Sequence, residues 1–390
     1  MKITDVICHT LFDPNTNPDA TSSAYDDLVV EIVTDAGIVG IGDSDTNPWM
    51  ARACIESPST HTMGMGLRDM LIDADPLDIE ALWWRMYVGS AHHGRRGAGV
   101  SAIGAVDIAL WDIKGKAAGK PCWQLQGEQA QDAVTPYASL QPEAGGDVDR
   151  YTKSLAEWAV RAKSNGFTVA KLEITPFGPY AHDGMNGPPG SVVEVAAACR
   201  DAVGSDMTLL VDVQYAFDDA KTALPILKEL EALDVFFIET PLWADDLEGY
   251  AYLADHLDMF VAQGEWLTTR WEFIDVMDRG KIDVAQPDVG RVGGLSEAKI
   301  VCDLARKRGR LIVPHCWLTG IGIAATTHMA VTAEHCKFIE FLPADQTDST
   351  LRRELLDEEL CLVDGKIMPP QKPGLGIEIN REALKKFAHK

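Results

Sequence analysis

The second half of the chain repeats one pattern six times, in the runs LLVD (209–212), FFIE (236–239), FVAQGE (260–265), IDVAQPD (282–288), LIVPH (311–315) and FIE (338–340). Each run is a short apolar stretch that leads into an acidic residue or a histidine. Successive end residues lie 23 to 27 positions apart, which is about the length of one strand, one helix and two short loops. The six end residues are Asp212, Glu239, Glu265, Asp288, His315 and Glu340.

Strands that alternate with helices at this spacing predict a parallel sheet closed into a (β/α)₈ barrel. Catalytic side chains in such a barrel stand at the carboxyl ends of the strands, where all six residues would converge. Turns also favour Asp and Glu, so any one of these residues alone is compatible with an ordinary loop carboxylate. Six consecutive units with a titratable residue at the same point favour an active site.

The size and charge of the chain limit its class. Its 390 residues exceed the roughly 250 of a single barrel, so we expect a second domain. The net charge of −24 opposes binding to nucleic acid or to an anionic membrane. No apolar run approaches the roughly 18 residues that span a bilayer, and the N-terminal residues do not resemble a signal peptide, so we expect a cytoplasmic protein. The eight cysteines lack paired spacing, which disfavours disulfides and zinc.

Residues 1–128 are expected to form an α+β domain. Residues 1–45 alternate in the manner of strands, with a turn at 35–37, and residues 48–127 have helical periodicity. The polar loop DPNTNPDATSSAYDD (13–27) separates the first two strands and is a candidate flap over the site.

The barrel is assigned to residues 129–364. Its first two strands are expected at 133–140 and 167–174, followed by a Gly/Pro-rich loop at 175–191 on the catalytic face. The tail, residues 365–390, carries turn signals and a last short helix, and we expect it to pack on the first domain.

The residue types at the strand ends indicate a metal and a base. Asp212, Glu239 and Glu265 are three carboxylates without a His or Cys among them, a set that suits Mg²⁺ or Mn²⁺ better than zinc. Clustered carboxylates would repel one another, so a dication is the expected compensation. Asp288 and His315 follow on neighbouring strands, where the carboxylate can orient the imidazole and raise its basicity. His315 is therefore the best candidate for a general base.

Over nearly its whole length the chain resembles the enolase superfamily, in its mandelate racemase-like branch. The matching segments are SAIGAVDIALWDIKGKAAGKP (101–121), VDVQ (211–214), FIETPL (237–242), AQGE (262–265), QPDVGRVGG (286–294) and VPHCW (313–317). The resemblance implies a modified (β/α)₇β barrel with an α+β capping domain built from the N-terminal region and the C-terminal tail, and it favours a homo-oligomer. It also implies Mg²⁺ held by Asp212, Glu239 and Glu265, a His315–Asp288 dyad, and Glu340 hydrogen-bonded to the substrate carboxylate.

Enzymes of this superfamily begin by abstracting the proton α to a carboxylate. Removing that proton places a second negative charge on the same group, so the metal, Lys171 and Glu340 are expected to stabilise the enediolate that forms. In this role Glu340 needs a protonated or shared carboxyl.

The chain departs from the pattern of the branch at the second barrel strand. Members that act on both faces of the substrate often carry Lys-x-Lys there, whereas this chain reads Lys171-Leu172-Glu173. Lys171 and Glu173 face the same side of a strand, so an ion pair between them is possible, with His315 as the principal proton shuttle. Gln214 stands where some acid-sugar dehydratases of the superfamily place a catalytic histidine. His182, in the loop after the second strand, is a candidate second acid, and both Gln214 and His182 are candidate substrate contacts.

We predict a Mg²⁺-dependent dehydratase of a sugar acid, which gives a 2-keto-3-deoxy acid. The polar flap suits a polyhydroxylated substrate, and Trp49 and Trp317 are candidates to stack on it. The first alternative is a cycloisomerase of a sugar lactone or an anhydro sugar acid, and the second is a racemase or epimerase of a 2-hydroxy acid. A catalytically silent binding relative is the alternative of another class.

Overall fold

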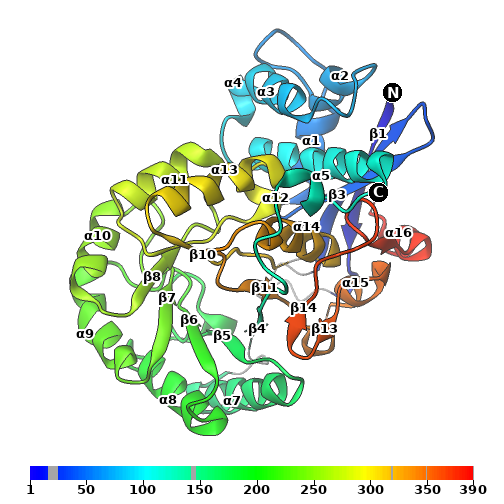
Figure 1. Ribbon diagram of the computed structural model, residues 1–390. Helices are drawn as coiled ribbons and strands as arrows, with labels where there is room; N and C mark the ends of the chain where they lie inside the picture. The colour runs from blue at the N-terminus through cyan, green and yellow to red at the C-terminus, as the bar shows by residue number, and fades with distance from the viewer. Residues whose placement is uncertain (16–24, 142–145, 318, 348, 390) are drawn as a thin grey trace.

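The computed structural model describes residues 1–15, 25–141, 146–317, 319–347 and 349–389 (Figure 1). Most of the expected flap, residues 16–24, lies outside the described residues. The described chain forms a parallel barrel with an α+β domain over one side, and no described helix is both long and apolar enough to cross a membrane.

An eight-stranded parallel sheet forms the barrel, in the order β10-β9-β8-β7-β6-β5-β4-β11. A bridge between Ile312 and Cys336 joins the two ends of this order and closes the barrel. The first two strands are shorter than expected, because proline and loop residues precede the paired segment. The strands are β4 (Pro136–Leu140), β5 (Val169–Glu173), β6 (Thr208–Asp212), β7 (Val235–Glu239), β8 (Phe260–Gln263), β9 (Val284–Ala285), β10 (Leu311–Ile312) and β11 (Ile339–Phe341).

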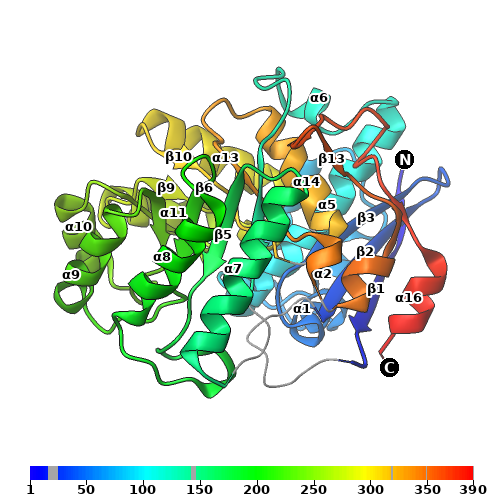
Figure 2. The same ribbon diagram turned by 90° about the horizontal axis from the view of Figure 1, so that it is seen from below.

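Helices connect the successive strands on the outside of the barrel, and the sequence β4-α7-β5 through α14-β11 is the (β/α)₇β arrangement (Figures 1 and 2). The amphipathic helices bury their apolar faces against the sheet. They are α7 (Val148–Ser164), α8 (Ser191–Val203), α9 (Ala220–Glu231), α10 (Leu247–His256), α11 (Thr269–Asp278), α13 (Gly294–Lys307) and α14 (Gly320–Val331), with a short α12 (Val289–Val292) before α13.

A separate apolar cluster fills the barrel interior, with one core residue at each strand. Strand side chains alternate between the two faces, so the residue two positions after an inward apolar residue also points inward. Phe237 is followed in this way by Glu239, and Val313 by His315. The apolar layer therefore closes the barrel below a polar mouth. Its members are Tyr137, Val169, Leu210, Phe237, Ala262, Val284, Val313 and Phe338.

The N-terminal domain begins with the antiparallel strands β1 (Ile3–Phe12), β2 (Asp26–Thr34) and β3 (Val39–Ser44), joined at the expected turn. Its helical part is interrupted between α2 and α3, because Asp73 adopts a positive φ of 64° and Pro76 follows. A core separate from that of the barrel fills this domain. The helices are α1 (Pro48–Glu56), α2 (Leu67–Leu71), α3 (Ile79–Gly89), α4 (Ala91–Gly94), α5 (Ala98–Ala118) and α6 (Trp123–Gln126).

The chain after the barrel returns to the N-terminal sheet. Figures 1 and 2 both show the last helix, α16 (Arg381–Phe387), beside β1, and a bridge joins Leu11 to Ala388. The domain boundaries at residues 128 and 364 stay a prediction. The remaining elements are η1 (His182–Gly184), η2 (Ala344–Gln346), α15 (Thr350–Glu354), β12 (Leu356–Glu358), β13 (Leu362–Val363), β14 (Lys366–Ile367) and β15 (Glu378–Ile379).

Helix α5 fixes the capping domain to the barrel. Asp107 of α5 accepts hydrogen bonds from the backbone N–H of Ser296 at 2.9 Å and from its hydroxyl at 2.6 Å. Gly294 passes close to this carboxylate with a φ of +90°, and a Cβ there would lie 2.3 Å from an Asp107 oxygen. Gly42 of β3 packs equally closely on α5, where a Cβ would lie 2.1 Å from the Ala105 carbonyl. These contacts hold the end of β3 at the barrel mouth.

We predict that Asp107→Ala destabilises the protein, because the Ser296 amide would be left buried without an acceptor, at a cost of about 1–3 kcal/mol. Urea unfolding followed by circular dichroism measures the change. Ser296→Ala keeps the amide donor and removes the hydroxyl, which donates to Asp107 and accepts from Trp111 Nε1 at 2.9 Å, and should cost less. Equal losses in the two variants would contradict the role given to the amide.

Candidate active site

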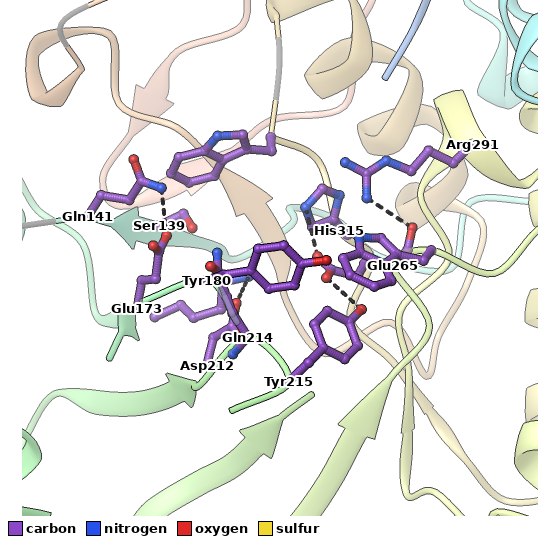
Figure 3. Close-up of a pocket in the computed structure, with 13 residues that line it drawn as sticks. Ser139, Gln141, Glu173, Tyr180, Asp212, Gln214, Tyr215, Glu265, Arg291 and His315 are labelled. Carbon is purple, nitrogen blue, oxygen red and sulfur yellow. Dashed lines mark hydrogen bonds and ion pairs between the residues drawn. The ribbon is translucent and has the colours of Figure 1, made fainter. Parts of the chain in front are cut away.

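Buried polar side chains gather at the carboxyl ends of the barrel strands and line a pocket of about 180 Å³ (Figure 3). Strands β4, β5 and β6, the loops after β4, β5, β6, β8 and β10, and helix α12 contribute side chains. Of the six strand-end residues, Asp212, Glu265 and His315 line the pocket, whereas Glu239, Asp288 and Glu340 are buried beside it. The lining residues are Ser139, Gln141, Lys171, Glu173, Tyr180, Asp212, Gln214, Tyr215, Glu265, Trp266, Arg291, His315 and Trp317.

Hydrogen bonds from neighbouring residues orient two of the three carboxylates expected to bind a metal. Asp212 Oδ1 accepts from the Thr240 hydroxyl at 2.7 Å and from the backbone N–H of Gln214 at 2.9 Å. The Tyr215 hydroxyl donates to Glu265 Oε1 at 2.7 Å. Supporting hydrogen bonds of this kind hold metal-binding carboxylates in a fixed geometry.

Glu239 provides the test of whether a dication fits. Its Oε1 accepts from Lys171 at 2.9 Å, while its Oε2 is buried without a hydrogen-bond partner. Burial and the neighbouring carboxylates raise the pKa of Glu239 to about 8 and that of Asp212 to about 6, although Lys171 opposes both shifts. One lysine therefore does not compensate this charge. An all-oxygen donor set with surplus negative charge fits Mg²⁺.

Among the described residues, the one group of three His, Cys, Asp or Glu side chains with ligand atoms within 4.8 Å of one another is Asp45, Asp288 and His315, and not the expected set of Asp212, Glu239 and Glu265. These residues already have partners of opposite charge or matching hydrogen bonds. The Arg291 guanidinium lies 2.7 Å from Asp45 Oδ2, and Asp288 accepts from the imidazole. Lys171 likewise lies 2.9 Å from Glu239, and the assignment of the ion to Asp212, Glu239 and Glu265 stays a prediction.

His315 and Asp288 form a short hydrogen bond, with 2.7 Å between Nδ1 and Oδ2. This contact leaves Nε2 on the side of the metal-site carboxylates, 3.3 Å from Glu265 Oε2. Burial alone would lower the pKa of His315, yet the charge of Glu340 and the bond to Asp288 raise it to about 9. The geometry is that of an oriented proton acceptor at the pocket wall.

Glu340 differs from the expectation that it donates a hydrogen bond to the substrate. Burial favours its protonation, but Lys171 and His315 outweigh burial and lower its pKa to about 2. Its oxygens accept from the Ser139 hydroxyl at 2.6 Å and from the Cys316 amide at 2.7 Å. Glu340 thus accepts hydrogen bonds from within the protein, one of them from Ser139, which lines the pocket, and its role toward a substrate stays a prediction.

The pair on β5 also differs from the expectation of a Lys171–Glu173 ion pair. Lys171 Nζ lies 2.9 Å from Glu239 Oε1 and 3.0 Å from Glu340 Oε1. Glu173 accepts instead from Gln141 Nε2 at 2.7 Å (Figure 3). Burial and the charge of Asp212 raise the pKa of Glu173 to about 8. Figure 3 shows Glu173 and His315 on opposite sides of the pocket.

Two of the four expected substrate contacts, Gln214 and Trp317, line the pocket, and two do not. His182 is buried rather than exposed, and its ring packs on Tyr151 at a centroid distance of 5.7 Å. Trp49 packs on the rings of Phe12 and His389, outside the pocket lining. Sequence spacing placed both near the mouth but gave no information on side-chain direction.

Several pocket residues had not been predicted. Ser139 and Gln141 end β4, a strand for which the sequence analysis named no functional residue. Tyr215 follows Gln214, and both adopt a positive φ, of 60° and 43°. Ser139 and Gln141 stand at the carboxyl end of a barrel strand, so a search of strand ends could have found them. Tyr180 and Arg291 lie farther along the chain than the strand ends, so the same search would have missed them. The unpredicted lining residues are Ser139, Gln141, Tyr180, Tyr215, Trp266 and Arg291.

Comparisons with known proteins agree with this architecture. Residues 9–127 match the family described as mandelate racemase / muconate lactonizing enzyme, N-terminal domain, and residues 154–383 match the enolase C-terminal domain-like family. The chain belongs to the mandelate racemase / muconate lactonizing enzyme family of the enolase superfamily.

The relatives of the chain in this family are enzymes. It is 32% identical to the D-galactarolactone cycloisomerase of Agrobacterium fabrum, over 99% of both chains. It is 30% identical to the arabinonate dehydratase of Saccharolobus solfataricus, over 92% of this chain and 90% of the other. The crystal structure of the 3,6-anhydro-D-galactonate cycloisomerase of Zobellia galactanivorans superimposes with a TM-score of 0.85 at 27% identity, over 100% of both chains.

We predict that Mg²⁺ raises the thermal midpoint of the protein, because an ion that binds only the folded state stabilises it, by ~2.7 kcal/mol at a hundred times its Kd. Glu239→Gln removes an anionic ligand and should shift this dependence to much higher Mg²⁺ concentrations.

Glu229→Gln, on the exposed face of α9, is the matched control and should behave as the unmodified protein does. Differential scanning fluorimetry over a Mg²⁺ series gives the measurement. A midpoint that does not respond to Mg²⁺ would contradict the metal site and support the catalytically silent alternative.

Proposed function

We propose that this protein is a Mg²⁺-dependent dehydratase of a sugar acid. The observation that supports it best is the placement of two proton-transfer groups on opposite sides of one pocket, His315 with Asp288 on one side and Glu173 on the other (Figure 3). Asp212 and Glu265 of the expected metal site line the same pocket. A substrate whose carboxylate rests at those carboxylates would present its α-carbon to one group and its β-oxygen to the other.

Asp212, Glu239 and Glu265 would hold the ion. Bound there, Mg²⁺ would offset the clustered negative charge, draw electron density from the substrate carboxylate and lower the pKa of His315 toward neutrality. Lys171 stands beside Glu239 and contributes a fixed positive charge on the same side of the pocket. Positive charge at this point favours the dianion that forms when the α-proton leaves.

His315 Nε2 takes the proton from the carbon α to the carboxylate. Asp288 keeps the other ring nitrogen protonated, so Nε2 carries the lone pair. As the imidazole becomes positive, the Asp288 carboxylate stabilises it without moving. The proton acceptor is therefore organised before the substrate binds.

Glu173 donates a proton to the departing β-oxygen. Its carboxyl is buried and held by Gln141, and burial favours the protonated form that a general acid requires. The α-proton leaves to His315 on one side and the β-hydroxyl leaves as water toward Glu173 on the other, so the elimination is anti. The enol that results tautomerises to a 2-keto-3-deoxy acid.

A second candidate is a cycloisomerase, in which the departing oxygen belongs to a lactone or anhydro ring. The similarity to the D-galactarolactone cycloisomerase over 99% of both chains favours it. The same two residues would serve, since only the leaving group differs. Loss of 18 mass units from substrate to product separates dehydration from isomerisation, which conserves mass.

We predict that His315→Asn abolishes both elimination and exchange of the α-hydrogen with D₂O, with a loss of ~10²–10⁴-fold or more in kcat. Proton NMR of the Mg²⁺-loaded variant with substrate measures both events. His256→Asn, at an exposed position on α10, is the control. Exchange of one epimer that persists in His315→Asn would instead identify Glu173 as a second base and favour an epimerase.

We predict that Glu173→Gln separates the two proton transfers. The variant keeps the base, so the α-hydrogen should still exchange with D₂O, while elimination falls by ~10²–10⁴-fold because the leaving oxygen receives no proton. The ratio of exchange to product formation, followed by NMR, is the measured quantity. Equal loss of exchange and elimination would contradict the role of Glu173 as the acid.

A further inference from the structure

The pocket adjoins a second cavity between the capping domain and the barrel, and Trp266 and Arg291 line both. The second cavity has a volume of about 450 Å³. A substrate held by its carboxylate at the metal site would direct its far end toward this space. The charge around the cavity therefore bears on which sugar acids fit. Its other lining residues are Asp26, Asp45, Thr46, Asn47, Gly97, Ala98, Ser101 and Thr268.

The basic side chains that line the first pocket are already paired. Lys171 Nζ lies within 3.0 Å of Glu239 and Glu340, and His315 Nδ1 lies 2.7 Å from Asp288. Lys171 and His315 both lie at the reacting end of the site. Because each already interacts with a carboxylate of the protein, neither is available to bind a second carboxylate of the substrate.

Arg291 is the one basic residue among the described residues that line the second cavity. Its Nε donates to the Asp45 carbonyl at 2.9 Å, and one terminal nitrogen donates to the Glu265 carbonyl at 3.2 Å. The other terminal nitrogen lies 2.7 Å from Asp45 Oδ2. All three guanidinium nitrogens thus have acceptors within the protein.

The remaining charges around the second cavity are negative. Asp26 and Asp45 line it, and Asp45 is already paired with Arg291, so the charge that faces a ligand is that of Asp26. Burial and the charge of Asp45 raise the pKa of Asp26 to about 6, which is below the pH of an assay at pH 8.

We infer that this enzyme accepts sugar acids with a single negative charge, aldonates or their anhydro or lactone forms, and rejects free aldarates. The inference rests on the proposed function, since it assumes that the reacting carboxylate lies at the metal site. A carboxylate at the far end would lose its water and meet Asp26, while Arg291 is already held by Asp45, an arrangement that opposes binding. Hydroxyl groups there would find neutral partners on Thr46, Asn47 and Ser101.

The test compares each hexonate with the hexarate of the same configuration at C2 to C5, using the Mg²⁺-loaded full chain at pH 8. The pairs include D-galactonate with galactarate and D-gluconate with D-glucarate. For the pair that reacts best, kcat/KM for the aldonate should exceed that for the aldarate by about 100-fold or more. An aldarate that reacts as well as its aldonate, or better, would overturn the inference.

Binding is measured separately, as the rise of the thermal midpoint with ligand concentration across the same library. If aldonates bind and aldarates do not, yet no bound acid eliminates water or opens a ring, the proposed function fails and the charge selection stands. If aldarates bind more tightly than aldonates, the charge selection fails whatever reaction occurs.

Asp26→Asn tests the cause, because it removes one negative charge from the cavity wall. The preference for the aldonate over the aldarate, as the ratio of their kcat/KM values, should fall about tenfold. Asp201→Asn, at an exposed position on α8, changes the net charge equally and should leave the ratio as it is. An unchanged ratio in Asp26→Asn would contradict the assignment of selectivity to this cavity.

Discussion

Negative charge confined in a dry barrel mouth is the constraint on which the rest of this site depends. Lys171 lies between Glu239 and Glu340, and each of these carboxylates is wholly buried. Buried anions are tolerated when a cation and hydrogen bonds compensate them, and one lysine serves several carboxylates here. The remaining deficit of positive charge is the reason for proposing a cation at the mouth. The proposed metal affinity, the proposed basicity of His315 and the proposed choice of substrate all rest on this deficit.

The capping domain takes part in the same electrostatic network. Strand β3 carries Asp43 and Asp45 to the barrel, where Asp45 pairs with Arg291 and Asp43 accepts from the Thr319 hydroxyl at 2.6 Å. Strand β3 packs closely on α5, and α5 packs on α13. This packing fixes the positions of Asp43 and Asp45 relative to the barrel. The rigid barrel thus determines the reaction, while the cap determines the charge that the far end of a substrate meets.

Alternation along each strand explains why so much of the site was predictable. A residue two positions beyond an inward apolar side chain also points inward, so Asp212 follows Leu210 and Glu239 follows Phe237. That rule is local and can be applied to the sequence alone. The rule does not give partners, since Lys171 faced Glu173 in the expectation but pairs across the barrel with Glu239 and Glu340. His182 likewise turns inward onto Tyr151.

The sequence by itself determined the barrel, the order of its strands, the carboxylates of the expected metal site and the His315–Asp288 pair, because strand period and strand-end position are short-range properties. Only the tertiary structure decided that Glu340 accepts from Ser139, that Gln141 donates to Glu173, and that Arg291 pairs with Asp45. These pairs join residues as far apart as 246 positions. Which opposite charges meet depends on distances across the folded mouth, and no local pattern encodes those distances.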